Sequence, residues 1–264
     1  MRSRRALRFV LMGIAGFSGA AAAQTPDQQR CVAPDPDLAI AGCTAMIQSG
    51  TDTQGNLAIA FMIRGIAYAR KGQYDRAVED YDQAIRIIPN FAKAFYNRGN
   101  VYADKGQYDR AIQDYDEAIR LNPNFVEAFY SRGNANAGKG QYDLAIKEFD
   151  QAIRLNPNFT NAFTNRGFAY IRKGQPDRAI PDLDQAIRLN PDVAQAYLNR
   201  GIAYGQKGQN DRAVQDFDQA IRLNPNDARA YDSRGTVLRA LGQPDRAAAD
   251  FAKARELNPK LPPR

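Results

Sequence analysis

A 34-residue segment recurs six times in tandem, and this periodicity constrains the chain more than any other feature. The copies follow one another without a gap and occupy residues 58–91, 92–125, 126–159, 160–193, 194–227 and 228–261. A fixed period of this length indicates an array in which each copy is one supersecondary unit that packs against its neighbours. The sequence therefore predicts stacked repeats rather than a single closed core.

Each copy has the pattern of two helices, here called helix A and helix B. In residues 92–125, apolar residues recur every three or four positions in both halves, which is the spacing of one helical stripe. Gly106 ends helix A, because glycine accepts the left-handed backbone of a helix C-terminus. Helix B begins near Tyr108, and Pro123 ends it because proline disfavours helical geometry in the residue before it.

Small residues explain why the two helices pack as a hairpin. Gly99 lies in the middle of helix A, where glycine costs about 1 kcal/mol relative to alanine. Every copy has a glycine at this position, so we expect it to let the side chain of Tyr115 approach closely from helix B. Ile112 and Ile119 also lie on helix B, and we expect them to cover the next copy.

These positions resemble the tetratricopeptide repeat (TPR) family, whose pattern is W-x2-L-G-x2-Y, then A-x3-F-x2-A, then P. The matching residues in the second copy are Phe95, Gly99, Tyr102, Ala111, Tyr115, Ala118 and Pro123. The resemblance implies an all-α fold, a right-handed α-solenoid of stacked antiparallel helix hairpins, with six TPR units after a degenerate N-terminal half-repeat. The chain departs from the family in having no Trp and in having arginine where a leucine usually precedes the glycine.

An acidic residue follows each of these arginines after sixteen positions. The arginines are Arg64, Arg98, Arg132, Arg166, Arg200 and Arg234. Their acidic partners are Asp80, Asp114, Glu148, Asp182, Asp216 and Asp250. We interpret this constant spacing as an internal ion-pair ladder, with a ligand-binding role as the alternative.

Residues 1–23 have the pattern of a secretory signal peptide. Four arginines precede an apolar run from Phe9 to Ala20, and small residues follow at 21–23. The run is short for a membrane span. We therefore expect a bacterial, exported protein that is periplasmic or secreted and has no stable membrane insertion. The general secretory route is favoured, and the twin-arginine route stays open.

Removal of this segment changes the charge balance. The whole chain has 36 basic and 29 acidic residues and a net charge of +7. Without the leader, 32 basic residues remain against 29 acidic ones, a net charge of +3. Because both signs alternate along the repeats, this small excess does not predict nucleic-acid binding.

Residues 24–57 form a degenerate capping repeat. The segment from Asp37 to Ile47 aligns with helix B of the second copy and puts Cys43 where that copy has Tyr115. Cys31 falls on a short preceding helix. An exported chain meets an oxidising compartment, so we predict a Cys31–Cys43 disulfide, with two separate buried thiols as the alternative.

The C-terminal repeat has a polar outer surface. The third copy lacks packing residues that the other copies have. Ala248 and Arg255 replace the apolar pair of the earlier helices B, and only residues 262–264 follow as a tail. Capped ends predict a monomer or weak dimer. Asn136 replaces a helix A tyrosine, and Gly138 adds a second glycine in the helix interior, so we expect a flexible joint between repeats 1–2 and 4–6.

The chain contains no histidine, no glycine-rich phosphate loop, no nucleophile elbow and no metal-ligand motif. We therefore expect no enzymatic activity, no catalytic residues, no metal and no cofactor.

The TPR resemblance implies that helices A line a concave groove that binds protein or peptide partners. Repeated asparagines could pair with a peptide backbone, as in the asparagine ladder that lines the TPR superhelix of O-linked N-acetylglucosamine transferases; generic solvation is the alternative. The candidate groove residues are Lys93, Tyr96, Asn97, Asn100, Tyr130, Asn134, Asn165, Phe168, Arg172, Asn199 and Arg229.

The chaperone-binding class of TPR proteins, which holds C-terminal carboxylates in a Lys–Asn–Asn–Lys–Arg clamp, is not matched. Asn100 fits one clamp position, but the others hold Tyr96, Ser131, Asn161 and Asn165. The sequence thus predicts a non-catalytic scaffold that binds protein segments in the cell envelope. The rivals are a regulatory or adaptor subunit of an envelope enzyme complex, an enzyme, and a binder of polyanions or membrane surfaces.

Overall fold

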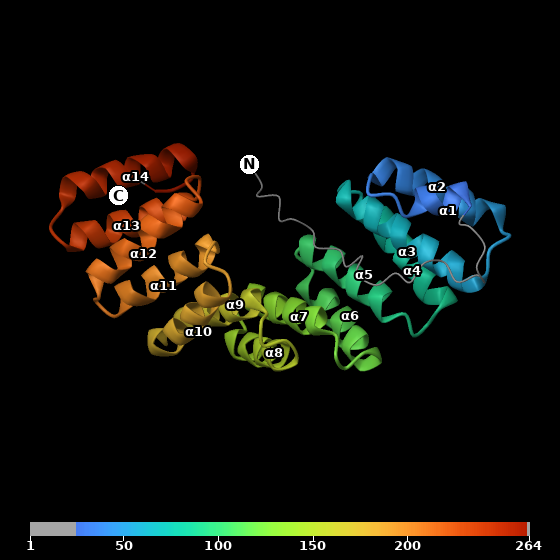
Figure 1. Cartoon of the computed structure of the whole chain (residues 1–264), viewed down its shortest axis with the longest axis horizontal. Coiled ribbons are helices and arrows are strands. Elements are labelled where there is room, and N and C mark those ends of the chain that lie inside the picture. Colours follow the sequence, from blue (N-terminus) through green and yellow to red (C-terminus); the bar gives the residue numbers. More distant parts are fainter. Residues whose placement is uncertain (1–24, 263–264) are drawn as a thin grey trace. The chain divides into compact units, whose positions relative to one another are not determined.

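A computed structural model describes residues 25–262, and every regular element in that range is an α-helix. Figure 1 shows the helices. The predicted signal peptide, residues 1–23, lies outside the described residues. The described residues divide into two compact units, here called unit 1 and unit 2, and the boundary between Ala135 and Asn136 falls inside helix α7 (Val126–Gly138).

Unit 1 consists of helix hairpins that stack on one another, since each helix A packs against its own helix B and against the preceding hairpin. Its other helices are α1 (Pro26–Cys31), α2 (Pro36–Ser49), α3 (Gln54–Arg70), α4 (Tyr74–Ile87), α5 (Ala92–Asp104) and α6 (Tyr108–Leu121).

Unit 2 repeats this arrangement. Its helices are α8 (Tyr142–Leu155), α9 (Thr160–Arg172), α10 (Pro176–Leu189), α11 (Ala194–Gln206), α12 (Asn210–Leu223), α13 (Ala228–Ala240) and α14 (Pro244–Leu257). The predicted all-α array of stacked helix hairpins is confirmed.

The helix ends follow the predicted signals. Helix α5 ends at Asp104, and Gly106 then adopts a left-handed φ of 74° before α6 begins at Tyr108. One boundary differs from the repeat frame. Helix α3 begins at Gln54, four residues before position 58, because the Thr53 side chain accepts a hydrogen bond from the Asn56 amide at 3.2 Å and caps an additional helical turn.

Each hairpin closes over the glycine of its helix A. A Cβ atom built on Gly99 would lie 2.8 Å from Cε1 of Tyr115, which is closer than two carbon atoms can pack. The same approach occurs between Gly65 and Tyr81. The prediction that glycine admits the helix B side chain is confirmed, and the tyrosine rings are buried.

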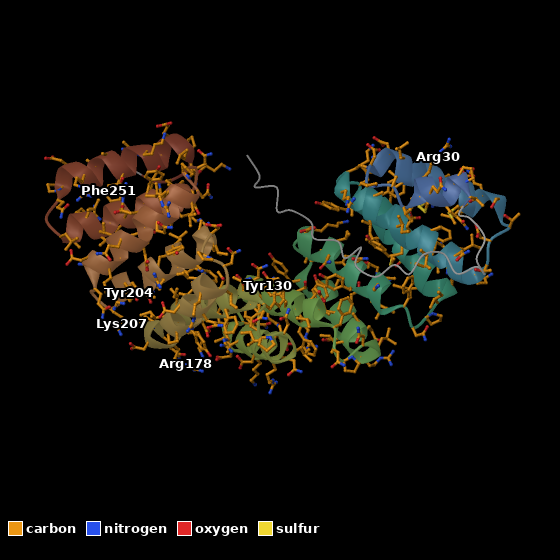
Figure 2. All side chains as sticks on the ribbon, in the orientation of Figure 1. Arg30, Tyr130, Arg178, Tyr204, Lys207 and Phe251 are labelled. Atoms are coloured by element: carbon orange, nitrogen blue, oxygen red, sulfur yellow. A yellow bond between two sulfur atoms is a disulfide. The ribbon has the colours of Figure 1, made fainter. Side chains whose placement is uncertain are left out.

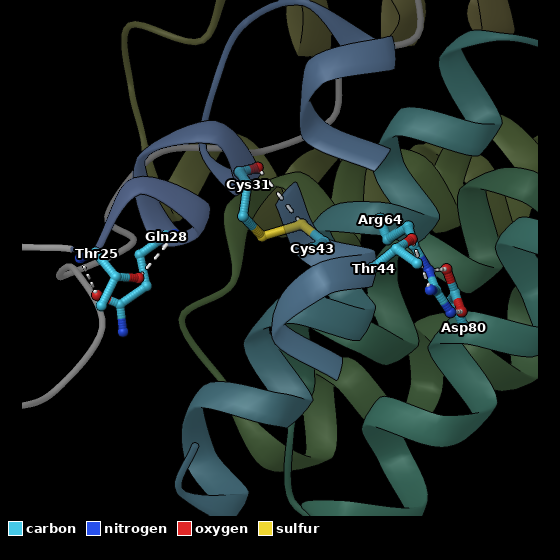
Figure 3. The surroundings of a disulfide bond; sticks show 7 residues. All are labelled: Thr25, Gln28, Cys31, Cys43, Thr44, Arg64 and Asp80. Atoms are coloured by element: carbon cyan, nitrogen blue, oxygen red, sulfur yellow. Dashed lines mark hydrogen bonds and ion pairs between the residues drawn. A yellow bond between two sulfur atoms is a disulfide. The ribbon is translucent and has the colours of Figure 1, made fainter. Parts of the chain in front are cut away.

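The N-terminal hairpin is held by the predicted disulfide. Cys31 at the end of α1 and Cys43 within α2 are bonded, both side chains are fully buried, and their Cα atoms are 4.5 Å apart (Figure 3). The alternative of two separate thiols is therefore wrong. Thr25 and Gln28 form a capping box at the start of α1, which satisfies exposed amides of this short helix.

The C-terminal end has the predicted polar surface. Ala248 and Arg255 of α14 are exposed, whereas Ile112 and Ile119 of α6 pack against the core of unit 1. The last helix therefore leaves no large apolar pair uncovered.

Helix α7 contains the residues predicted to weaken the third repeat. Asn136 is buried, at 6% exposure, and Gly138 is the last residue of the helix rather than an interior one. In four of the other repeats a helix B arginine packs on the helix A tyrosine, as Arg178 does on Tyr170. The third repeat has Asn136 and the exposed Leu144 at these two positions, so it lacks that contact. The flexible joint stays a prediction.

Candidate functional site

The predicted groove residues divide between the two units. Unit 1 holds Lys93, Tyr96, Asn97, Asn100, Tyr130 and Asn134. Unit 2 holds Asn165, Phe168, Arg172, Asn199 and Arg229.

Three of these side chains are buried. Asn97 has no exposed surface, Asn199 is 2% exposed and Tyr96 is 4% exposed. These three candidate groove residues are not accessible, because neighbouring helices cover them. A continuous accessible row of asparagines is therefore not present at this repeat position.

The two buried asparagines have different surroundings. The Asn199 carbonyl accepts a hydrogen bond from the Gln195 amide at 2.8 Å. Neither amide atom of Asn97 has a hydrogen-bond partner among the described residues. The hydroxyl of Tyr81, which is also fully buried, has none there either. Buried polar groups without partners destabilise a fold by roughly 1–3 kcal/mol each.

Tyr96 belongs to an aromatic cluster in unit 1. Its ring lies 4.8 Å from the Phe125 ring and 6.0 Å from the Tyr115 ring, measured between centroids. Burial raises the pKa of the Tyr96 hydroxyl, and the hydroxyl of Ser131 lies 3.5 Å away. Tyr96 therefore packs the repeat interface and offers no surface to a partner.

Asn100 has a structural contact as well, because it accepts a hydrogen bond from the Tyr115 hydroxyl at 2.8 Å. Lys93, Tyr130 and Asn134 are partly exposed. These three side chains are the accessible part of the predicted unit 1 group, and their role in binding stays a prediction.

In unit 2, three predicted residues form a partly exposed stripe on α9. Asn165, Phe168 and Arg172 follow one another at spacings of three and four, so they share one face of the helix. The Arg172 guanidinium lies 5.7 Å from the Phe168 ring centroid and 5.1 Å from that of Tyr142. We call Asn165, Phe168 and Arg172 the α9 stripe.

Arg229 is exposed but is held by its neighbours. It bonds Asp227, the N-cap residue of its own helix α13, and donates a hydrogen bond to Gln195 at 2.8 Å. It therefore links α13 to α11 and stays accessible on one side.

Five of the six predicted pairs of the arginine ladder are confirmed, each bidentate and formed inside one repeat, and the Arg132–Glu148 pair stays a prediction. Arg166 donates from Nε and Nη2 to the two carboxylate oxygens of Asp182, at 2.7 and 2.6 Å. The same pairs form between Arg64 and Asp80, Arg98 and Asp114, Arg200 and Asp216, and Arg234 and Asp250. Desolvation raises the pKa of the Asp182 carboxyl, and the Arg166 guanidinium opposes that rise.

The ladder also has a second arm, which the sequence reasoning missed. Arg166 Nη1 donates to Asp150 of the preceding repeat at 2.6 Å, and its guanidinium lies 5.6 Å from the Phe163 ring centroid. The equivalent acids in other repeats are Asp82, Asp116, Asp184 and Asp218. Their 34-residue recurrence was the available signal, and the sixth repeat has Ala252 at this position instead of an acid.

These contacts show what the repeated charges do. We call an arginine with its two acidic partners, such as Arg166 with Asp182 and Asp150, an arginine clamp. The clamp joins helices A and B of one repeat to helix B of the repeat before it. A second pair connects successive repeats, as in Lys105 with Asp75 at 2.5 Å. Within residues 25–262, no three His, Cys, Asp or Glu side chains are grouped as metal ligands are. No described helix is long and apolar enough to cross a membrane.

The fold and the periodic clamps define a repeat scaffold of helix hairpins. A family model of the TPR repeat matches residues 65–106, 99–140 and 137–174, and a second tetratricopeptide repeat model matches residues 164–228 and 198–262. The chain belongs to the tetratricopeptide repeat family, whose fold is generally a non-catalytic scaffold for protein interaction.

Solved structures with a similar fold support this family membership. The chain is similar to MamA, with 30% identity and a TM-score of 0.54 over 61% of this chain and 95% of that one. It is also similar to YrrB, described as a TPR protein with an unusual peptide-binding site, with 26% identity and a TM-score of 0.58 over 71% of this chain and 95% of that one.

A tetratricopeptide repeat protein from Parabacteroides merdae shares the fold, with 24% identity and a TM-score of 0.68 over 85% of this chain and 87% of that one. No curated protein matches the chain.

Proposed function

We propose that this chain is an exported, non-catalytic scaffold that binds segments of other proteins on the accessible surfaces of its helices A. The observation that carries the proposal is the membership of the TPR family together with the similarity to YrrB, which is described as having a peptide-binding site. The arginine clamps support the proposal, because their repeated charged residues form ion pairs that hold the helices together.

The α9 stripe is the part of the predicted site that best suits this role. Phe168 supplies an aromatic surface beside the cation of Arg172, and Asn165 supplies an amide one helical turn away. Aromatic and arginine side chains are the types that most often dominate binding energy at protein interfaces. A peptide laid along α9 would place an apolar side chain against Phe168.

Two features support export to the periplasm. One is the signal-peptide pattern of residues 1–23. The other is the buried Cys31–Cys43 disulfide, since disulfides persist in oxidising compartments. A regulatory or adaptor role for an envelope enzyme would use the same binding surface and would appear as an activity that co-purifies with the protein.

A phage-displayed library of short random peptides, panned against residues 24–264, tests the binding proposal. We expect selected peptides whose affinity falls about tenfold when Phe168 and Arg172 are both changed to alanine. Ile202→Ala/Gln206→Ala, at the equivalent positions of α11, is the matched control and should leave the affinity unchanged. Failure of the wild-type chain to select any peptide would overturn the proposal.

Fractionation of cells that express the full chain tests the location. We expect the protein in the periplasmic fraction, shortened at its N-terminus and without thiols that react with maleimide under denaturing, non-reducing conditions. Retention of the full-length chain in the cytoplasm contradicts export, whatever the outcome of peptide selection.

A further inference from the structure

An open hollow of about 620 Å³ lies in unit 2 and is lined by helix B of the third repeat (α8), by α9 and by helix B of the fourth repeat (α10). Arg154 of α8 and Arg178 of α10 both line it, and Tyr170 of α9 lines it as well. Arg178 is labelled in Figure 2. We call this hollow the α8–α10 notch. Its lining differs from the α9 stripe, so it is a separate surface.

Proline at position 181 reduces the side-chain volume in the notch. Pro181 lines the hollow and stands at a helix B position where most repeats have a longer side chain. The residues there in the other repeats are Glu79, Gln113, Lys147, Gln215 and Ala249. The next pair of helices B, α10 and α12, has Gln215 at this position and the same residue types at the other equivalent positions. This pair therefore serves as an internal control for the effect of Pro181.

Pro181 also changes the backbone at the edge of the notch. A proline nitrogen carries no hydrogen, so the helical hydrogen bond from residue 181 to the Asp177 carbonyl is absent. Asp177 lines the same hollow. Its carbonyl oxygen retains the capacity to accept a hydrogen bond from a peptide amide.

Three arginines and three aspartates line the notch, and Lys207 pairs with one of the aspartates, so a net charge of +1 remains. Arg166 is bound by Asp150 and Asp182, and the side chain of Asp177 is paired with Lys207. Arg154 and Arg178 form hydrogen bonds only with neutral groups among the described residues, and Arg178 also interacts electrostatically with Asp182. Arg154 bonds Gln151, while Arg178 bonds Gln175 at 3.4 Å and the Tyr170 hydroxyl at 2.8 Å.

An apolar wall adjoins these two cations. Ile153 and Pro181 line the hollow from different helices. The Arg178 guanidinium lies 4.3 Å from the Tyr170 ring centroid, so it is held near the wall. Arginine binds carboxylates through paired hydrogen bonds in a fixed plane, which suits an acidic side chain better than a neutral one.

We infer that the α8–α10 notch binds an acidic segment of a partner protein, with an Asp or Glu carboxylate between Arg154 and Arg178 and a neighbouring apolar side chain against Ile153 and Pro181. This inference rests on the proposed function, because it requires a protein partner. It adds a second site and names the chemistry of the segment that the site accepts.

Fluorescence anisotropy with a labelled, amidated Leu-Glu-Glu-Leu peptide tests the inference. We expect binding that weakens about tenfold in Arg178→Gln and in Arg154→Gln, since each loses a charge-assisted hydrogen bond. Pro181→Gln should also weaken binding, because it places a long side chain in the hollow. This variant restores a helical N–H, so loss of folding does not explain a loss of binding.

The equivalent pair Arg188→Gln and Arg212→Gln, in the α10–α12 frame with Gln215, is the matched control. An equal loss in these variants would overturn the inference, because it would mean binding to general surface charge. A Leu-Gln-Gln-Leu peptide with a free C-terminus should bind weakly; if it binds as well as the acidic peptide, the notch takes terminal carboxylates and the inference is wrong.

The two proposals can fail separately. Peptides selected by phage display that depend on the α9 stripe and ignore Arg154 and Arg178, with no binding of the acidic peptide, would overturn the notch while leaving the proposed function in place.

Discussion

The N-terminal hairpin and the hairpins that follow it hold their helices together by different means. In α3–α4 and α5–α6, a buried tyrosine of helix B covers a glycine of helix A. In α1–α2, Cys43 stands in the place of that tyrosine and is bonded to Cys31. Helix α1 has only six residues and buries little surface, so a covalent bond replaces packing that it cannot supply.

The interface between repeats differs in the same region. Arg98 reaches back to the carboxylate of Asp82, whereas Arg64 reaches back to the hydroxyl of Thr44 at 3.0 Å (Figure 3). Thr44 occupies the cap position that aligns with the acid of a full repeat. The cap thus preserves the geometry of the clamp and drops one charge, which shows that the clamp tolerates a neutral acceptor at its outer arm.

The largest effect is expected from Arg98→Leu, which breaks the clamp inside the array. The variant leaves the buried Asp114 carboxylate without its bidentate partner, so we expect the free energy of unfolding to fall by about 3–5 kcal/mol. Urea denaturation followed by circular dichroism measures the change. Arg98→Leu/Asp114→Leu removes both charges and should recover much of the loss; a single variant as stable as the wild type contradicts the role of the clamp.

A smaller effect is expected from Cys31→Ala/Cys43→Ala in the cap. The bond closes a short loop, with a sequence separation of 12, and its loss should lower stability by about 2–3 kcal/mol. Hydrogen exchange should show the loss in α1 and α2, with amides of unit 2 unaffected. The control is the wild type under reducing conditions, which should match the variant; uniform loss of protection would mean that the disulfide does more than hold the cap.

Two tyrosines at the same repeat position provide a matched pair with a smaller effect. The Tyr115 hydroxyl donates to Asn100, whereas the Tyr81 hydroxyl is buried without a partner among the described residues. Tyr115→Phe should therefore cost about 1 kcal/mol, and Tyr81→Phe should be neutral or stabilising. Thermal denaturation of the two variants compares them directly. Equal losses would show that the Asn100 contact does not contribute.

The smallest effect is expected from Thr44→Asp, which gives the cap the acid of a full repeat. A new ion pair with Arg64 should add roughly 0.5 kcal/mol, because part of its energy is screened by solvent. The gain should decrease at high salt and vanish in an Arg64→Leu background. A gain that survives without Arg64 would have another origin, such as helix propensity in α2.

Much of the fold could be predicted because the repeat marks equivalent positions. Gly99 and Tyr115 recur together, so their contact could be inferred from spacing alone, and the same argument found the pairing of Arg98 with Asp114. The second arm to Asp82 recurs with equal regularity and was missed, because a period does not say whether a residue faces its own repeat or the preceding one.

The candidate site was less predictable. Asn97 and Asn165 share one repeat position, yet the first is fully buried and the second is partly exposed. The difference depends on the side chains that neighbouring helices bring over each residue, which sequence spacing does not describe. The α8–α10 notch has the same origin, since Arg154, Tyr170 and Pro181 reach it from three different helices.

The sequence by itself determined the hairpin module, its boundaries, the disulfide and one arm of each clamp, because these depend on residue type and on distances along one or two helices. Tertiary structure alone decided which polar side chains are accessible, which acid completes each clamp and where a hollow forms. Those properties arise from surfaces of different helices that meet in space, and burial there is a sum over neighbours rather than a property of the repeat position.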